Sequence, residues 1–452
     1  MKNIFPFWAN WYIMQYEQRW PEPPAERKND MHQRMELLPG VWLQGVRTDR
    51  FKSACLSFSL LRPLCRQEAA LNALLPNVLI QGSARHESLQ DISRALDQLY
   101  GASMGPLVRK CGEIQTCGFY LSFLEDRFAM TGDRILEPML DLLREILLEP
   151  MLEQGAFLPA YVEREKENLI STIESGLNDK RAYADRQMLR AMCREDGFGV
   201  PRLGEIEDVR AITPASLYRH YRRVLASSRI EIFYAGSADL TALGEQLRAL
   251  LRELPRESLA GLPFAPMPRR PEPQYLEETM ELTQGKLSMG FTTGITTRDP
   301  RFPALMVCNA LFGGGLTCKL FQNVRERLSL CYYVSSMVYG AKGIVMVSSG
   351  IDTSNYTLAK DEILRQLEAC QAGDITPEEL TAAQEAICSS LKTVPDSVGR
   401  MEDYALFCIL NDFPLEPEAY RAAARAVTVE DAAAAAREIR LDTIFFLKGA
   451  SQ

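Results

Sequence analysis

Two side chains that could hold an anion lie close together in the second half of the chain. Arg325 is followed by Tyr332 seven positions later (332 − 325), and a glycine run, Gly313 to Gly315, precedes both. A cation and a phenol held at a helix–strand junction can clamp an oxyanion. Glycines let the backbone come close to a ligand or bend as a hinge. An alternative without chemistry is an Arg that suits a helix end, a Tyr that begins a strand, and a tight turn between helices.

The residues around this pair predict a short amphipathic helix and then a strand. Five apolar side chains recur at helical spacing and predict one buried face: Leu316, Leu320, Phe321, Val324 and Leu328. Arg325 lies at the edge of that face. The strand is expected from Tyr332 onward, as the first arm of a hairpin over residues 332–351 that turns at residues 340–343.

Length and composition limit the kind of protein. The chain has 452 residues, too many for one core, so two or three domains are expected. Its net charge of −8 argues against nucleic acid and anionic membranes as partners. It has 11 cysteines, with no C-x-x-C pair, which favours reduced thiols in the cytoplasm over a secreted disulfide framework. The sequence contains no apolar run of about 18 residues, so a membrane span is not expected.

Metal-ligand spacing is also missing from the sequence. The three histidines, His32, His86 and His220, lie far apart, and each is expected at the surface.

Residues 1–34 are rich in aromatic side chains and then in proline, without the pattern of a signal peptide. We interpret this extension as a disordered or docking arm, or as an over-extended reading frame, because Met31 or Met35 would begin the globular part.

Strand and helix patterns alternate through the remaining chain. Alternating apolar residues over 53–60 predict a half-buried strand, residues 67–81 predict a helix that Gly82 ends, and residues 127–148 predict a further helix. Residues 255–275 contain repeated prolines and predict a stiff linker. We therefore expect domains over residues 35–254 and 276–452.

The two halves repeat each other at a nearly constant distance. Ile212-Thr213-Pro214, which opens a helix, matches Val427-Thr428-Val429 at an offset of 215 (427 − 212). A strand that ends at Gly236 matches one that ends at Gly449, at an offset of 213 (449 − 236). This spacing indicates duplication of an α+β domain. Each copy is predicted to be an antiparallel sheet with helices packed on one face.

The duplicated organisation and the residues from Phe312 to Ser336 resemble the pitrilysin/insulinase family of zinc peptidases, the inverzincins, and the processing peptidases related to it. The resemblance covers about residues 35–450. It implies that the chain forms half of a clam shell. It also implies that Arg325 and Tyr332 face a zinc ion across a closed chamber, where they bind and polarise the scissile peptide.

The first domain, which binds zinc in the family's active members, departs from the family's pattern. The family carries H-x-x-E-H on the helix before the first G-[ST] turn. The resemblance places Ala73 at the first His, Pro76 at the Glu and Asn77 at the second His, while Thr172 takes the place of the third ligand, a Glu. Catalytic zinc needs about three protein ligands and an open position. We therefore expect no zinc on this chain and no base to activate water.

The resemblance then implies a role as the zinc-less subunit of a heterodimeric metallopeptidase. Arg325 and Tyr332 would act in trans to a zinc-bearing partner of the same family, and Gly313, Gly314 and Gly315 would contact the peptide substrate. The alternative is an inactive peptidase-like scaffold, or a peptide-binding protein, that contributes nothing to catalysis and could be a homodimer. No Ser/His/Asp set, phosphate loop or nucleotide fingerprint supports an independent enzyme.

The missing ligands lead to a first prediction. We expect the purified chain to contain no stoichiometric zinc and to hydrolyse no peptide by itself, because the positions of two ligands carry a methyl group and an amide. Metal analysis by mass spectrometry and a peptide hydrolysis assay test this. One zinc ion per chain, or cleavage that a chelator abolishes, would contradict it.

Overall fold

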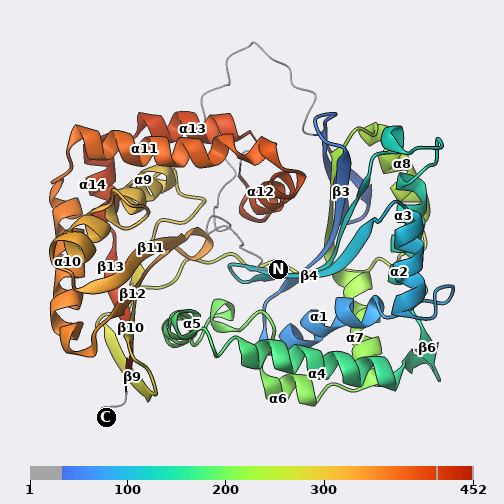
Figure 1. Ribbon diagram of the computed structural model, residues 1–452, viewed down its shortest axis with the longest axis horizontal. Helices are drawn as coiled ribbons and strands as arrows, with labels where there is room; N and C mark the ends of the chain where they lie inside the picture. The colour runs from blue at the N-terminus through green and yellow to red at the C-terminus, as the bar shows by residue number, and fades with distance from the viewer. Residues whose placement is uncertain (1–32, 414–415, 450–452) are drawn as a thin grey trace.

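The computed structural model describes residues 33–413 and 416–449. Apart from its last two residues, the extension predicted for residues 1–34 therefore lies outside the described residues. Two α+β units lie side by side, the first on the right of Figure 1 and the second on the left. Among the described residues, none of the helices has the length and apolar character that crossing a membrane requires.

The first unit is built on a six-stranded sheet in the order β1-β2-β8-β3-β5-β4. Its neighbouring strands are antiparallel, except for the parallel pair β2 and β8. The strands are β1 (Gln33–Leu38), β2 (Val41–Arg47), β3 (Ser53–Pro63), β4 (Ser103–Cys111), β5 (Ile114–Leu124) and β8 (Arg229–Gly236), with a small ribbon of β6 (Leu152–Glu153) and β7 (Ala156–Phe157). The helices are α1 (Arg66–Leu79), α2 (Leu89–Gln98), α3 (Leu136–Leu148), α4 (Pro159–Ser175), α5 (Lys180–Met192), α6 (Ile206–Arg210), α7 (Pro214–Ser227) and α8 (Leu240–Leu250).

The second unit is built on a five-stranded sheet in the order β11-β12-β10-β13-β9. The strands are β9 (Gln274–Met280), β10 (Gly285–Thr292), β11 (Cys331–Tyr339), β12 (Ile344–Ile351) and β13 (Arg440–Gly449). The helices are α9 (Phe302–Phe312), η3 (Leu320–Arg327), α10 (Tyr356–Ala372), α11 (Pro377–Lys392), α12 (Val398–Asn411), α13 (Pro417–Ala426) and α14 (Val429–Arg437). Only β9 and β13 pair in parallel.

The two sheets have the same topology, which confirms the predicted α+β duplication. Taken from β4, the first sheet runs β4-β5-β3-β8-β2, and each pair has the direction of its counterpart in β11-β12-β10-β13-β9. Capping boxes begin α7 at Thr213 and α14 at Thr428, at the offset of 215 (428 − 213). The predicted antiparallel sheets are confirmed, and each unit adds one parallel pair.

Each unit also covers the other unit's sheet with one helix. Helix α5 of the first unit packs on β10 and β13, and α12 of the second unit packs on β3 and β8. Both helices lie between the two sheets in Figure 1. Their starts differ by 218 positions (398 − 180), close to the offset of the repeat. The prediction of helices on one face only is therefore incomplete, since an exchanged helix covers the second face.

This exchange corrects the interpretation of residues 53–60. Strand β3 is buried on both faces from residue 54 to residue 62, although its apolar and polar residues alternate. The side chains of Cys55, Met401 and Ala405 belong to one apolar cluster. Helix α12 therefore covers the face of β3 that was expected to contact water. Small side chains alternate with large ones here because a helix packs closely against them.

Two predicted helix bounds are also wrong. Helix α1 ends at Leu79 with Ile80 as its C-cap, so Gly82 lies beyond the helix end. The helix expected over 127–148 begins only at Leu136. The Asp126 carboxylate accepts hydrogen bonds from the backbone N–H groups of the two residues at this helix start, at 2.8 and 3.0 Å, and thereby fixes it.

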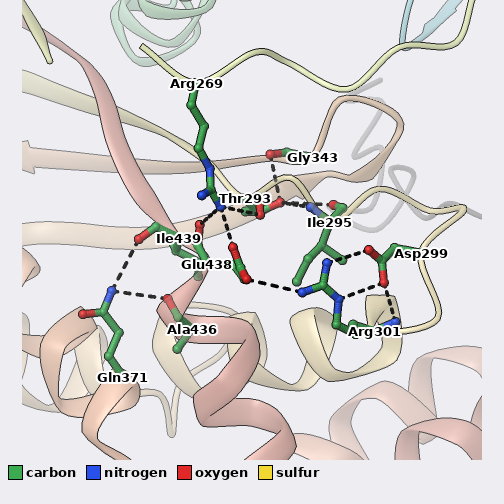
Figure 2. Close-up of polar contacts among 10 residues, drawn as sticks. All are labelled: Arg269, Thr293, Ile295, Asp299, Arg301, Gly343, Gln371, Ala436, Glu438 and Ile439. Carbon is green, nitrogen blue, oxygen red and sulfur yellow. Dashed lines mark hydrogen bonds and ion pairs between the residues drawn. The ribbon is translucent and has the colours of Figure 1, made fainter. Parts of the chain in front are cut away.

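Residues 255–273 contain neither helix nor strand, and arginines attach this segment to both units. The Arg256 guanidinium donates to three backbone carbonyls of the first unit. The Arg269 guanidinium donates to the carboxylate of Glu438, to which Arg301 also donates (Figure 2). The segment is thus held by directional contacts along its length, while the domain bounds themselves stay a prediction.

A buried ammonium group joins the two units at the tip of the β11–β12 hairpin. Lys342 has a side chain that is 1% exposed, and its Nζ lies 2.8 Å from a Glu113 carboxylate oxygen and 2.6 Å from one of Asp196. Nearby, Arg109 forms a two-armed ion pair with Glu402, at 2.9 and 2.7 Å. Both pairs connect residues of the first unit with residues of the second.

We expect Lys342→Met to lower the free energy of unfolding by about 3 kcal/mol, because it leaves two carboxylates facing each other in a largely buried site. Arg50→Ala is the control. Arg50 and Asp396 also join the two units, at 3.4 Å, but their side chains are 56% and 58% exposed, so its effect should stay below about 1 kcal/mol. Denaturant titration measures both, and equal effects would contradict the role of Lys342.

Candidate functional site

The glycine run connects α9 to η3 and passes along the outer edge of the second sheet. Strand β11 is one of the two edge strands of that sheet. The Gly313 N–H donates to the Asn309 carbonyl at 2.9 Å, and the Gly313 carbonyl accepts from the Ser336 N–H at 2.9 Å. The loop is therefore fixed both to the helix before it and to the strand beside it.

The three glycines differ in how closely other atoms pack against them. A Cβ atom at Gly313 would lie 2.5 Å from the Ser336 Oγ and 2.8 Å from the Ser336 nitrogen, and one at Gly314 would lie 2.8 Å from the Ala310 Cα. A Cβ atom at Gly315 would meet nothing within 4 Å. Close packing thus explains the first two glycines, whereas no described residue lies close enough to require the third.

The predicted helix that carries Arg325 is present as a π-helix, η3. At its end the Leu328 N–H donates at 3.2 Å to the carbonyl of Asn323, five residues earlier (328 − 323), which is the hydrogen-bond spacing of a π-helix. Leu316 and Leu328 are 72% and 41% exposed, so they do not join the predicted buried face, while Leu320 and Val324 do. A π-turn holds more residues than an α-turn, which shifts side chains out of α-helical register; π-turns are frequent at functional sites.

Arg325 and the three glycines line one cavity of about 330 Å³. The Arg325 side chain is 42% exposed, and its ion pair with Glu326 is loose, at 3.8 Å. Its guanidinium carbon lies 4.7 Å from the centre of the Phe321 ring. The structure therefore brings four of the five predicted site residues together and leaves the cation accessible to a ligand.

Tyr332 lies at a β-bulge and outside the lining of this cavity. Cys331 pairs with Ile351 and Tyr333 with Gly350, so Tyr332 is the additional residue, and it is 57% exposed. Tyr333 lines the cavity instead, and burial raises the pKa of its phenol to about 12. Bulges beside active sites re-aim side chains. The role of Tyr332 stays a prediction.

Several lining residues are missed by the sequence analysis. They are Asn309, Ser335 and Ser336, together with Tyr333. The Ser336 hydroxyl donates to the Asn309 side-chain oxygen at 2.7 Å. Asn309 did give a signal, because it is a single amide within the apolar helix Phe302–Phe312.

The positions expected to hold zinc carry side chains that do not fit the metal. Ala73 and Pro76 are buried in α1, and the Asn77 amide donates to the Ala73 carbonyl at 2.9 Å. Thr172 is exposed on α4 and donates to its own helix, to the Asn168 carbonyl, at 2.8 Å. Helices α1 and α4 pack together, yet the part of the chain that the structure describes contains no group of three metal-ligating side chains.

A buried polar network connects α1 to the neighbouring elements. The Asn72 side chain contacts the His220 Nε2 at 2.7 Å and donates to Gln115 at 2.8 Å. His220 is 3% exposed, so the prediction of a surface histidine is wrong for it. Burial, together with the nearby Arg223 guanidinium, lowers the pKa of His220 to about 3. His220 is thus a neutral core residue bonded to the helix that lacks the ligands.

The glycine geometry leads to a prediction about stability. Gly313→Ala should lower the free energy of unfolding by about 1–3 kcal/mol, because its Cβ would force the loop away from β11. Gly315→Ala should change it by no more than about 0.5 kcal/mol, because its Cβ meets open space. Thermal unfolding compares the two variants. A Gly315→Ala variant that unfolds as readily as Gly313→Ala would contradict this assignment.

Comparisons with known proteins agree with this fold. The family model described as "Peptidase M16 inactive domain" matches residues 211–387. A Bacillus subtilis protein named "Probable inactive metalloprotease YmfF" is 32% identical over 412 residues, which are 91% of this chain and 96% of the relative. An "Uncharacterized zinc protease SCO5738" of Streptomyces coelicolor is 26% identical over 271 residues, 59% of this chain and 55% of the relative.

Solved structures show the same architecture. A conserved protein from Enterococcus faecalis superposes with a TM-score of 0.87 at 28% identity, over 93% of this chain and 99% of that one. A peptidase M16 inactive domain from Pseudomonas fluorescens superposes with a TM-score of 0.75 at 18% identity, over 93% of this chain and 98% of that one. The second comparison shows the fold alone.

Proposed function

The chain belongs to the M16 family of peptidases, and from this we propose that it is the zinc-less subunit of a heterodimeric metallopeptidase. In this role it contributes Arg325 and Tyr332 to an active site whose metal lies on a zinc-bearing partner of the same family. Its substrate is a peptide, and its compartment is the cytoplasm. The observation that carries the proposal is an accessible Arg325 beside the glycine loop, in a chain whose zinc positions hold no ligands.

Arg325 suits the stabilisation of negative charge on a peptide oxygen. Its guanidinium is partly exposed and forms a loose ion pair with Glu326, at 3.8 Å. A ligand oxygen that binds Arg325 therefore displaces only this weak contact. Charge-assisted hydrogen bonds are about twice as strong as neutral ones. A donor aimed at the oxygen on which charge develops accelerates acyl transfer.

Tyr332 suits contact with a substrate held by another chain. Its phenol is exposed, and Tyr332 is the extra residue of the β-bulge. The side chain is therefore accessible to other molecules. A phenol hydrogen donates to a carbonyl oxygen or to a tetrahedral intermediate. The glycine loop on the same face as Arg325 allows an extended peptide to come close to the backbone.

The zinc ion is assigned to the partner because the described residues of this chain contain no group of side chains that could hold it. The positions that correspond to ligands carry a methyl group, an amide bonded to its own helix, and a hydroxyl bonded to its own helix. A network around Asn72 and His220 fills the neighbouring core. This chain therefore contributes binding and orientation, and not water activation.

A peptide-binding scaffold without any catalytic contribution is the second candidate. It is favoured by the name of the Bacillus subtilis relative, which describes a probable inactive metalloprotease. Under this alternative the cavity still binds peptide, but Arg325 has no effect on a reaction rate. The two candidates differ in one measurable quantity, the activity of a reconstituted complex.

We expect this chain to restore peptide cleavage when it is combined with a zinc-bearing M16 chain from the same genome. Arg325→Ala should then lower kcat/KM by about 100-fold to 1,000-fold, the usual effect of losing one donor to an oxyanion. The matched control is Arg327→Ala, on the same helix. The Arg327 side chain is 58% exposed and lies 3.8 Å from Glu362, outside the cavity lining.

Size-exclusion chromatography and zinc analysis accompany the assay and show that each variant still forms the complex. Full activity in the Arg325→Ala complex would contradict the catalytic role and leave the scaffold. A chain that forms no complex with any zinc-bearing relative would contradict the heterodimer itself.

A further inference from the structure

The cavity at the glycine loop has apolar walls and a single charged lining residue. The walls come from η3, from α9 and its following loop, and from β11: Met306, Leu316, Phe321, Val334, Met337 and Val338. Arg325 supplies the charge, and no carboxylate of a described residue lines the cavity. The volume of about 330 Å³ lies at the small end of the range for ligand sites. The composition therefore suits a small apolar group that carries one negative charge.

Backbone donors add to this charge. The N–H groups of Gly314, Gly315 and Leu316 make no hydrogen bond to any described residue, and all three residues line the cavity. Successive N–H groups in a turn form concave anion sites. Gly315 belongs to this set, and it is the glycine for which packing within the chain gives no reason. A ligand that comes close to its backbone supplies that reason.

The outer edge of β11 offers a further set of backbone groups. The Ser336 N–H points away from β12 and donates to the Gly313 carbonyl. In an antiparallel pair, residues two apart point their backbone groups to the same side. The backbone groups of Val334 and Val338 therefore also point outward, on either side of the Ser336 N–H that the Gly313 carbonyl occupies, and both residues line the cavity. A short stretch of peptide backbone can pair with the part of this edge that the glycine loop leaves open.

We propose that this cavity binds the carboxylate end of an extended peptide whose last side chain is apolar. Arg325 and the loop N–H groups hold the carboxylate, the apolar walls take the last side chain, and the β11 edge pairs with the peptide backbone. One guanidinium matches one negative charge in a fork geometry. A phosphate group, with its higher charge, fits a site with one cation and apolar walls less well.

This proposal deepens the proposed function and rests on it for its biological meaning. Hydrolysis of a peptide bond adds water and turns the scissile carbonyl into the carboxylate of the N-terminal fragment. The Arg325 guanidinium that stabilises the oxyanion therefore also matches that product carboxylate. It follows that the cavity selects an apolar residue before the cleaved bond, and that products with such an end bind competitively.

The test measures binding of fluorescein-labelled hexapeptides to the purified chain alone by fluorescence anisotropy. One peptide ends in Leu with a free carboxylate, a second has the same sequence with a C-terminal amide, and a third ends in Ser with a free carboxylate. A fourth carries the C-terminal amide and an Asp at the last-but-one position. This peptide distinguishes an acidic side chain from a terminal carboxylate as the source of the charge.

We expect the Leu acid to bind at least tenfold more tightly than its amide and at least threefold more tightly than the Ser acid. Arg325→Ala should remove the preference for acid over amide, Arg325→Lys should weaken it, and Arg327→Ala should leave it unchanged. Gly315→Ala should weaken binding of the acid without lowering thermal stability. Thermal unfolding of each variant shows that the fold is kept.

Equal binding of acid and amide, or an acid preference that survives in Arg325→Ala, would overturn the proposal. Equal affinity for the Leu acid and the Asp-containing amide would overturn it as well, because the cavity would then bind acidic side chains. The assay needs no partner chain. Failure here therefore leaves the heterodimer standing, and a failed reconstitution leaves the carboxylate site standing.

Discussion

The exchange of one helix between the two units is the constraint on which the structure depends. Without α5, the second sheet would expose the apolar side chains of β13 and β12 that now surround Met188 and Met192. Without α12, the first sheet would expose the row around Cys55 and Phe233. Burial of apolar area is the main favourable contribution to folding, so neither unit completes its core alone. The buried Lys342 ammonium then fixes how the two units sit on each other.

The candidate site follows from this arrangement through backbone geometry more than through charge. Strand β11 is an edge strand of its sheet, and the glycine loop is bonded to it through Gly313. Helix η3 then places Arg325 on the cavity. In the first unit, α1 is part of the core, with Asn72 bonded to a neutral His220. The repeat thus contains one unit with an accessible cation and one whose metal positions are closed.

Much of the fold could be predicted from local patterns, because the two copies share their caps and strand ends at a constant spacing. Thr213 and Thr428 begin equivalent helices, and both strands end at a glycine. The second layer on each sheet could not be predicted, since alternation in β3 has the same form whether water or α12 covers the polar positions. In the site, Arg325 and the glycines were found by residue type and spacing. The bulge at Tyr332 depends on pairing with β12, and the π-helix depends on tertiary contacts, so neither leaves a local signal.

The helix exchange also gives the single chain the internal arrangement of a two-fold dimer. Each of two like units covers the other's sheet with one helix, and these helices, α5 and α12, start 218 positions apart (398 − 180). In a symmetric dimer the two copies contact each other through the same surface patch. Neither unit of this chain can leave the other without exposing the apolar side chains that the exchanged helix covers.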